Sequence, residues 1–301
     1  MLQKFNPKNE NILIHVGGEL FARDEAKVSV FDSVVQGGDA VWEGLRVYDG
    51  RIFCLDKHLQ RMQDSAHALA FKNIPTVEEI KAAVFQTLEA NNMTDGVHIR
   101  LTLTRGTKIT SGMDPRLNQF GCTIIVLAEH KAPVYDKKGI RLVTSNIRRN
   151  SPQFLDSKIH HANLLNNILA KVEANFAGVD DALMLDEHGF VSEVNATNIF
   201  IVRDGMVHTS HPDNCLPGIT RGIVLDLCKQ LEITCVERNI SLSECYNADE
   251  VFVTGTMGEL ALVQEIDGRA ISNKSGAAIL SQLNKAFFEM TKQEGTLLPF
   301  A

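Results

Sequence analysis

Hydrophobic and polar positions in the first half of the chain alternate between strand-like and helix-like periods. ILIHV and ELFA flank Gly17-Gly18, and LRVY and RIFCL flank Asp49-Gly50, which predicts two hairpins because these turn residues tolerate positive φ. In LDKHLQRMQDSAHALAF the apolar residues fall at helical spacing, with Asp56 as the expected N-cap. A second helix fits EEIKAAVFQTLEANN, and strands return in VHIRLTLTRG and GCTIIVLAE.

The second half has the same mixed pattern. IRLVTSN, ALMLD, FVSEV, NIFIV, MVHTS and EVFVTG are expected strands, with turns at His188-Gly189, at an Asp-Gly pair inside NIFIVRDGMVHTS and at Asp267-Gly268. Helices are expected in NLLNNILAKVEA, from about 219 to 231, and near 275 to 292. Strands and helices mixed in this way predict an α+β fold.

A stretch without periodicity between the two halves predicts a boundary between two domains. The stretch EHKAPVYDKKG combines a proline with charged residues and has no periodicity, which is typical of a linker. We therefore expect an N-terminal α+β domain over residues 1–130, a linker over 131–138 and a C-terminal cofactor-binding domain over 139–301.

Composition narrows the class of partner. The 301 residues carry a formal charge of -7 without a long basic stripe, which favours small molecules or proteins over nucleic acid. Six cysteines are scattered without a C-x-x-C pair, as in proteins of a reducing compartment. The N-terminus lacks a continuous apolar run, and CTIIVLA is too short to span a bilayer. A cytoplasmic protein with no membrane partner is expected.

Several short catalytic motifs are missing from the sequence. There is no G-x-x-x-x-G-K-[ST], no H-E-x-x-H, no G-x-S-x-G and no complete G-x-G-x-x-G. His160 and His161 are adjacent, so in an extended segment their side chains point to opposite sides and do not share a metal. Solvated or packing histidines are expected there, and no metal site.

Two turns made of small residues are suited to an anion. LPGITRG places Gly218, Ile219 and Thr220 at the start of a helix, where backbone N–H groups and the helix dipole favour a phosphate. VTGTMGE ends a strand in a second such turn, which contains Thr256. Taken alone, each turn is more often an ordinary cap without a ligand.

Three charged residues have both a catalytic and an ordinary interpretation. Glu193 shares a strand face with Val191 and Asn195, so it points either into a pocket or to solvent. Arg61 lies off the apolar stripe of its helix, which favours a solvated arginine. Lys158 precedes an amphipathic helix and is either surface charge or a catalytic amine.

The order and spacing of several motifs resemble the class IV, or fold type IV, pyridoxal-phosphate enzymes. These motifs cover nearly the whole chain: VWEGLRVYDGRIFCLDKHLQRMQDSA, the Lys158 segment with NLLNNILAKVEA, SEVNATNIF, LPGITR and TGTMGEL. Members include branched-chain amino-acid aminotransferases, D-amino-acid aminotransferases and 4-amino-4-deoxychorismate lyases. The resemblance implies a smaller N-terminal α+β domain, a larger C-terminal pseudo-barrel domain, and a homodimer whose active site borrows a loop from the neighbouring subunit.

The resemblance also implies a role for each candidate residue. Lys158 is similar to the lysine that forms the internal aldimine with pyridoxal 5'-phosphate and moves the substrate proton, and Glu193 to the carboxylate on the pyridine nitrogen. Leu216 is similar to a residue that packs on the ring face. The implied phosphate-binding residues are Arg61, Gly218, Ile219, Thr220 and Thr256.

The same resemblance implies a set of residues that bind the substrate. Arg100 and Arg46 are similar to the arginines of the branched-chain enzymes, and the amides of Thr256 and Met257 to further carboxylate donors. Three tyrosines of that pattern are replaced here, by Gly37, His98 and Leu164. The NLL and TGTMGEL forms resemble the D-amino-acid and lyase relatives more closely.

We therefore expect a transaminase that moves an amino group between an amino acid and a 2-oxo acid such as 2-oxoglutarate, with branched-chain-like L-amino acids as donors. Three alternatives stay open. These are a D-amino-acid aminotransferase, a lyase that releases pyruvate from aminodeoxychorismate, and an inactive protein that only binds the cofactor.

Overall fold

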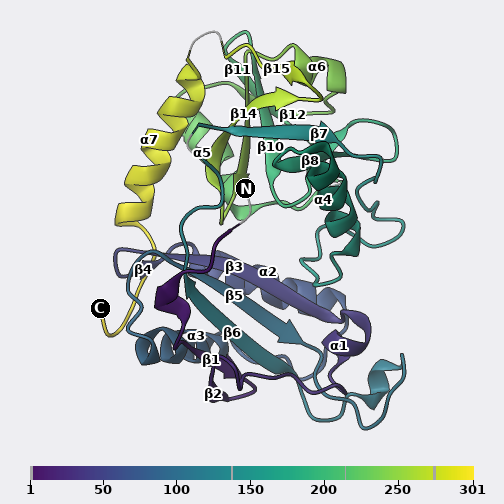
Figure 1. Cartoon of the computed structure of the whole chain (residues 1–301), viewed down its shortest axis with the longest axis vertical. Helices are drawn as coiled ribbons and strands as arrows, with labels where there is room; N and C mark the ends of the chain where they lie inside the picture. The colour runs from purple at the N-terminus through teal and green to yellow at the C-terminus, as the bar shows by residue number, and fades with distance from the viewer. Residues whose placement is uncertain (1–2, 137, 214, 274–275) are drawn as a thin grey trace. The chain divides into compact units, whose positions relative to one another are not determined.

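The computed structural model describes residues 3–136, 138–213, 215–273 and 276–301 (Figure 1). Residue 137 of the expected linker and residue 275 of the last expected helix lie outside these ranges. The chain divides into two compact units. The N-terminal unit comprises Gln3–Ala132, Ile159–Asn163 and Thr291–Ala301, and the C-terminal unit comprises Pro133–Lys158 and Leu164–Met290.

The N-terminal unit is a seven-stranded antiparallel sheet with helices packed against it. The strand order is β16-β4-β3-β5-β6-β1-β2. Its strands are β1 (Leu13–Val16), β2 (Glu19–Ala22), β3 (Ala40–Tyr48), β4 (Arg51–Ile52), β5 (Val97–Thr104), β6 (Thr123–His130) and β16 (Thr296–Leu297). Its helices are α1 (Ser33–Gly37), α2 (Leu55–Ala68) and α3 (Val77–Ala90).

The two longer helices of this unit form where their apolar stripes predicted. Leu59 and Met62 of α2 and Val84 of α3 are buried in the core of the unit. Thr76 starts α3 with a capping box to Glu79. The expected cap of α2 was wrong: Cys54 is the N-cap, at φ 52°, and Asp56 lies in the first turn. The chain leaves the short strand β4 and enters the helix through this left-handed residue, so the helix already includes the carboxylate that was expected to cap it.

The C-terminal unit contains a nine-stranded mixed sheet. Its order is β12-β11-β10-β13-β14-β7-β8-β9, and β15 pairs with β14. The strands are β7 (Ile140–Thr144), β8 (Asp181–Leu185), β9 (Val191–Val194), β10 (Asn198–Arg203), β11 (Met206–Thr209), β12 (Cys235–Glu237), β13 (Glu250–Gly255), β14 (Glu259–Ile266) and β15 (Arg269–Ala270). The helices are α4 (Leu165–Ala177), α5 (Ile219–Gln230), α6 (Leu242–Tyr246) and α7 (Ala278–Gln293). The α+β class predicted from the sequence is confirmed.

Strands β10 and β13 are neighbours inside this sheet, and their pairing fixes the position of Asn198 relative to the turn after β13. Asn198 lies opposite Thr254, and Phe200 opposite Phe252. The two phenylalanine rings are buried and stack with centroids 5.1 Å apart. Packing of this kind fixes the strand ends from which Asn198 and the turn after Gly255 project.

Two segments of the expected C-terminal domain, 139–301, belong to the N-terminal unit instead. Residues Ile159–Asn163 lie along β3, where the Trp42 amide donates to the His160 carbonyl (3.0 Å) and the Ala162 amide to the Ala40 carbonyl (2.8 Å). Residues Thr291–Ala301 include β16, which pairs with β4. Both departures have one cause: these segments complete the backbone hydrogen bonding of the N-terminal sheet.

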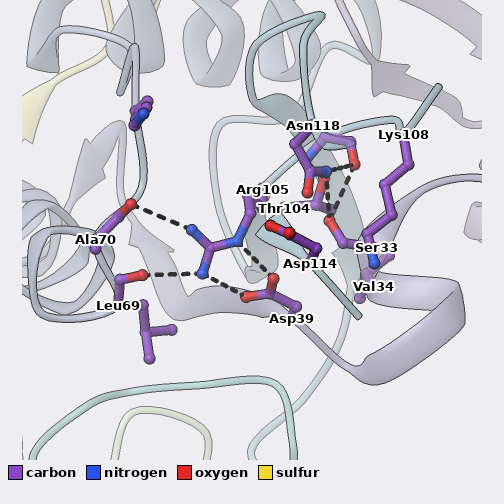
Figure 2. A network of polar contacts seen from close by, with 12 residues as sticks. Ser33, Val34, Asp39, Leu69, Ala70, Thr104, Arg105, Lys108, Asp114 and Asn118 are labelled. Carbon is purple, nitrogen blue, oxygen red and sulfur yellow. Dashed lines mark hydrogen bonds and ion pairs between the residues drawn. The ribbon is translucent and has the colours of Figure 1, made fainter. Parts of the chain in front are cut away.

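A polar network joins two connecting segments of the N-terminal unit, residues 29–39 around α1 and residues 105–122 between β5 and β6 (Figure 2). The Arg105 guanidinium donates to both Asp39 oxygens (2.5 and 3.1 Å) and to the Leu69 carbonyl (2.9 Å). The Ser33 hydroxyl and the Asn118 amide donate to the Gly106 carbonyl. The same segments expose large apolar side chains, namely Val30, Phe31, Val35, Ile109, Met113 and Phe120.

Two further features concern the helices and the cysteines. Within the described ranges, the helices are all too short or too polar to cross a bilayer. All six cysteines are unpaired thiols.

Candidate active site

Glu193 is the buried carboxylate of the C-terminal unit. It lies on β9 with 4% of its surface exposed, so the solvent-facing interpretation is excluded. Arg149 Nε donates to Oε1 at 2.5 Å, and Asn198 Nδ2 donates to Oε2 at 3.0 Å. Burial raises the pKa of Glu193, and the guanidinium of Arg149 opposes that rise. The site thus holds a desolvated carboxyl that is paired with the guanidinium of Arg149.

Asn198 links this carboxyl to the start of α5. Its amide also donates to the Leu216 carbonyl at 2.8 Å. Gly218 is the N-cap of α5, and a Cβ at this position would lie 2.1 Å from Asn198 Oδ1. A Cβ there would require the Asn198 amide to shift, and the bonds of this amide to Glu193 and Leu216 oppose that shift. Ile219 and Thr220 therefore open the helix beside a residue with no capping side chain, and the first-turn N–H groups of a helix lack intrahelical partners. Such an end favours an anion.

Thr256 and Met257 lie in the turn between β13 and β14. The Met257 carbonyl accepts a hydrogen bond from the Val134 amide at 3.0 Å. Thr256 follows two residues after Thr254, whose register partner is Asn198. The strand pairing thus connects this turn with Asn198, and through Asn198 with Glu193 and Gly218.

Lys158 is the last residue of Pro133–Lys158, which is one of the two described segments of the C-terminal unit. Its side chain is 45% exposed, and Nζ lies 3.9 Å from Asp213 Oδ1. The Lys158 amide donates to Asp156 Oδ1 at 2.9 Å, which shapes the turn that carries it. The amine is therefore accessible to a small molecule, and its contact with the Asp213 carboxylate is a long one.

Arg61 is not the solvated arginine that its helix position favoured. It lies in the N-terminal unit, and its side chain is 15% exposed. Nε and Nη2 donate to the two oxygens of Glu43 at 2.8 and 2.6 Å. Glu43, fully buried on β3, fixes the plane of the guanidinium.

Arg46 and Arg100 lie on the other face of the same strands. Arg46 opposes His98 and Gly44 opposes Arg100 in the β3–β5 register, so these side chains share one face. The Arg100 guanidinium lies 3.5 Å from the Trp42 ring centroid, and burial lowers its pKa to about 10. Burial, helped by Lys131, Arg46 and Arg100, lowers the pKa of His98 to about 3. This face of β3 and β5 therefore carries the positive charges of Arg46 and Arg100 beside the neutral imidazole of His98.

The adjacent histidines, His160 and His161, lie packed against other parts of the N-terminal unit. Among the described residues, no group of three or more His, Cys, Asp or Glu side chains is arranged to hold a metal ion. The His160 ring packs on Trp42 with centroids 4.3 Å apart and bonds to Glu43 at 3.1 Å. His161 is buried. Packing histidines, one of the two expected alternatives, are what the structure contains.

The sequence did not point to Arg149, Asn198 or Glu43. Arg149 is separated from Glu193 by 44 residues, and no local motif links the two. Asn198 directly follows a polar turn, and nothing in the local sequence distinguishes it from an ordinary polar residue at the start of a strand. Glu43 stands in an apolar strand pattern, which is the one signal that could have found it, because a buried carboxylate requires partners.

Comparisons with known proteins agree on one family. The family model described as amino-transferase class IV matches residues 40–266. The branched-chain-amino-acid aminotransferase-like protein 2 of Arabidopsis thaliana is 59% identical over 97% of the chain but only 53% of its own length. The branched-chain-amino-acid aminotransferase of Pseudomonas aeruginosa is 32% identical over 92% of both chains. The chain thus spans about half the length of the Arabidopsis relative and most of the bacterial one.

A solved structure extends the likeness to the fold. The T.th. branched-chain amino acid aminotransferase, in complex with N-(5'-phosphopyridoxyl)-L-glutamate, superposes with a TM-score of 0.86. It is 31% identical, and the match covers 94% of each chain. The fold is accordingly fold type IV, with a pseudo-barrel C-terminal domain.

Replacing Gly218 and Gly222 by alanine should have opposite effects. Gly218→Ala drives a Cβ into Asn198 Oδ1, and we expect a loss of about 1–3 kcal/mol in the free energy of unfolding. Gly222 lies inside α5 with nothing within 4 Å of its added Cβ, so Gly222→Ala should stabilise by roughly 0.5–1 kcal/mol. Urea unfolding measures both. Equal effects would contradict the close approach of Asn198.

Arg149→Met should make stability more sensitive to pH. Without the guanidinium, the pKa of Glu193 rises further above its unfolded value. The folded state then binds more protons than the unfolded state, so the free energy of unfolding falls as pH rises through that interval. Urea unfolding at about pH 5 and about pH 8 should show a larger drop in the variant, with a penalty of about 3–5 kcal/mol at the higher pH. Parallel pH profiles for variant and wild type would contradict the pairing.

Proposed function

The chain belongs to the amino-transferase class IV family, and we propose that it is a pyridoxal 5'-phosphate-dependent aminotransferase. The proposed reaction moves an amino group between a branched-chain-like L-amino acid and a 2-oxo acid such as 2-oxoglutarate. The observation that carries the proposal is the connection through Asn198 of a buried carboxyl, Glu193, with the glycine-capped start of α5. One residue joins an acceptor for a protonated ring nitrogen to an anion-binding helix end.

The residues of the C-terminal unit fit this cofactor chemically. Glu193 would accept a hydrogen bond from the protonated pyridine nitrogen, whose positive charge compensates for the burial of the carboxylate. The amides of Ile219 and Thr220 and the hydroxyl of Thr256 would donate to the phosphate, and Leu216 would pack on the ring. Gly218 leaves the backbone uncovered at the helix start. Arg61 of the N-terminal unit would add a charged donor to the phosphate.

Lys158 would carry the catalytic proton. Its accessible Nζ would bind the cofactor covalently and later move the proton to and from the substrate Cα. When bound, the cofactor supplies an electron-withdrawing ring that stabilises negative charge at that carbon. Asp213, at 3.9 Å from Nζ, is an exposed side chain that leaves the amine room to move.

The cationic face of β3 and β5 supports a carboxylate substrate. Arg46 and Arg100 share this face, and the lowered pKa of His98 keeps its ring neutral, so it does not add a third charge there. The amides of Thr256 and Met257 would provide further donors. The branched-chain preference is supported by the likeness to branched-chain-amino-acid aminotransferases. The L-glutamate and 2-oxoglutarate side of the reaction is supported by the complex of the T.th. enzyme with a phosphopyridoxyl derivative of L-glutamate.

A homodimer is part of the proposal. The segments joined by the Arg105–Asp39 network expose Val30, Phe31 and Met113, among others. Helix α4 separately exposes an apolar stripe at helical spacing, formed by Leu165, Ile168, Leu169, Val172 and Phe176. Monomeric soluble proteins rarely keep such contiguous apolar patches in water. The unpaired thiols further support a reducing compartment, and we propose the cytoplasm.

Half-reactions with single amino acids test the function. Protein saturated with pyridoxal phosphate should be yellow, and L-leucine, L-valine and L-glutamate should each convert the bound cofactor to its pyridoxamine form. Lys158→Ala should slow this conversion by at least about 10²-fold, because it removes the general base. Absorbance spectroscopy follows the conversion.

The same experiment separates the alternatives. Conversion by D-isomers only would replace the proposed substrate class with D-amino acids. Pyruvate release from aminodeoxychorismate without an acceptor oxo acid would select the lyase. A coloured protein inert with all of these substrates would contradict the proposed enzyme activity altogether.

A further inference from the structure

Glu43 receives four hydrogen bonds inside the N-terminal unit. Arg61 Nε and Nη2 donate at 2.8 and 2.6 Å, His58 Nδ1 lies 2.6 Å from Oε2, and His160 Nδ1 lies 3.1 Å from Oε1. An ionised carboxylate offers about four lone-pair sites and no proton. Glu43 is therefore saturated, and a histidine that bonds to it does so as the donor, through Nδ1–H. For His160 the 3.1 Å contact with Glu43 is shorter than the competing 3.4 Å contact between Nδ1 and Arg61 Nη2.

The network is close to electrically neutral. Burial by itself raises the pKa of Glu43. At the low pH where this carboxyl titrates, the charge of a protonated His160 and the hydrogen bonds from Arg61, His160 and His58 hold its pKa well below the usual range. Burial lowers the pKa of His58 and of His160, so neither ring adds a charge near neutral pH. One carboxylate and one guanidinium remain, which is the arrangement that a buried site tolerates.

His160 is fixed by more than its ring nitrogen. Its amide donates to the Ser65 hydroxyl at 3.1 Å, and its carbonyl accepts from the Trp42 amide at 3.0 Å. Its ring packs on the Trp42 ring at 4.3 Å. The Trp42 indole N–H also donates to the His161 carbonyl at 3.2 Å. The segment that begins immediately after Lys158 is thus held to β3 and α2 by backbone and side-chain contacts.

Covalent geometry carries this restraint to Lys158. Two residues of extended backbone span at most about 7 Å, so a fixed His160 restricts the positions open to the lysine two residues earlier. The Glu43 carboxylate, which accepts the hydrogen bond from His160, also orients Arg61. A single buried group therefore restrains both the candidate phosphate-binding arginine and the segment of the candidate catalytic lysine.

We propose that Glu43 and His160 are positioning residues for Lys158 and Arg61: the Glu43–His160 hydrogen bond sets the segment after Lys158 against the carboxylate that also orients Arg61. This inference rests on the proposed function, because it gives Lys158 and Arg61 their roles toward the cofactor. Neither Glu43 nor His160 needs to touch substrate or cofactor to act in this way.

Two substitutions at His160 separate the hydrogen bond from the ring contact. His160→Phe keeps a ring on Trp42 but removes the N–H that Glu43 accepts, whereas His160→Asn keeps an amide N–H near the Nδ1 position. We expect His160→Phe to slow covalent attachment of pyridoxal phosphate to the apoprotein by about tenfold or more, since a hydrogen bond to a charged group is lost. We also expect it to shift the pH at which the absorbance of the attached cofactor changes. His160→Asn should restore most of both properties.

His15→Phe is the matched control. His15 is a buried histidine on β1 of the same unit, outside the Glu43 network, and it undergoes the same change of side chain. Stopped-flow absorbance gives the attachment rate, and calorimetry of each apoprotein gives its melting temperature. We expect His160→Phe to attach cofactor more slowly than His15→Phe at comparable melting temperatures.

Two outcomes would overturn the inference in distinguishable ways. If the wild type attaches the cofactor, and His160→Phe does so at the same rate and with the same pH profile, the positioning role is wrong while the proposed function stands. If the wild type itself attaches no cofactor, the proposed function fails and this inference fails with it.

Discussion

A carboxylate can be buried in β9 only if other groups compensate for its lost hydration, and Glu193 obtains that compensation from Arg149 and Asn198. An unpaired buried charge would cost several kcal/mol, a large part of the stability of a typical domain. This requirement places Asn198 at the start of β10. The position of Asn198 in turn favours glycine at the N-cap of α5, because a Cβ there would lie 2.1 Å from Asn198 Oδ1. An ion-pairing constraint thus bears on the backbone at the candidate anion-binding end of the helix.

The N-terminal unit meets the same constraint in another way. Glu43 is fully buried on β3 and is neutralised by Arg61, while His58 and His160 satisfy its remaining lone pairs. Three of these four residues come from β3 and α2, and the fourth comes from a segment far later in the chain. The polar network therefore gives β3 a specific partner in Ile159–Asn163, where apolar contacts alone would specify the register less strictly.

Much of the fold followed from local pattern. The hairpins at Gly17-Gly18 and Asp49-Gly50, the apolar stripes of α2 and α3, and the strands of both halves appear where periodicity predicted them. The N-cap of α2 and the assignment of Ile159–Asn163 to the N-terminal unit did not. The cap depends on a left-handed residue, Cys54, that propensity does not reveal, and the assignment depends on pairing between segments far apart in the sequence.

The candidate site likewise contains residues that local sequence predicts and residues that it does not predict. Residues at chain turns, such as Gly218 and Thr256, were identifiable because a turn has a local composition. The partners of Glu193 and Arg61 were not, because an ion pair between distant segments leaves no periodic trace in the sequence. The expected solvated state of Arg61 was wrong for this reason: Arg61 does lie off the apolar stripe of its helix, but Glu43 lies opposite it.

The proposed chemistry depends most on Lys158 as the covalent attachment point of the cofactor. Borohydride reduction of the yellow protein, followed by protease digestion and mass spectrometry, identifies the residue that carries the phosphopyridoxyl group. We expect a single modified peptide that contains Lys158. Modification at a different lysine, such as Lys171 on α4, or no modified peptide from a fully coloured protein, would contradict this assignment.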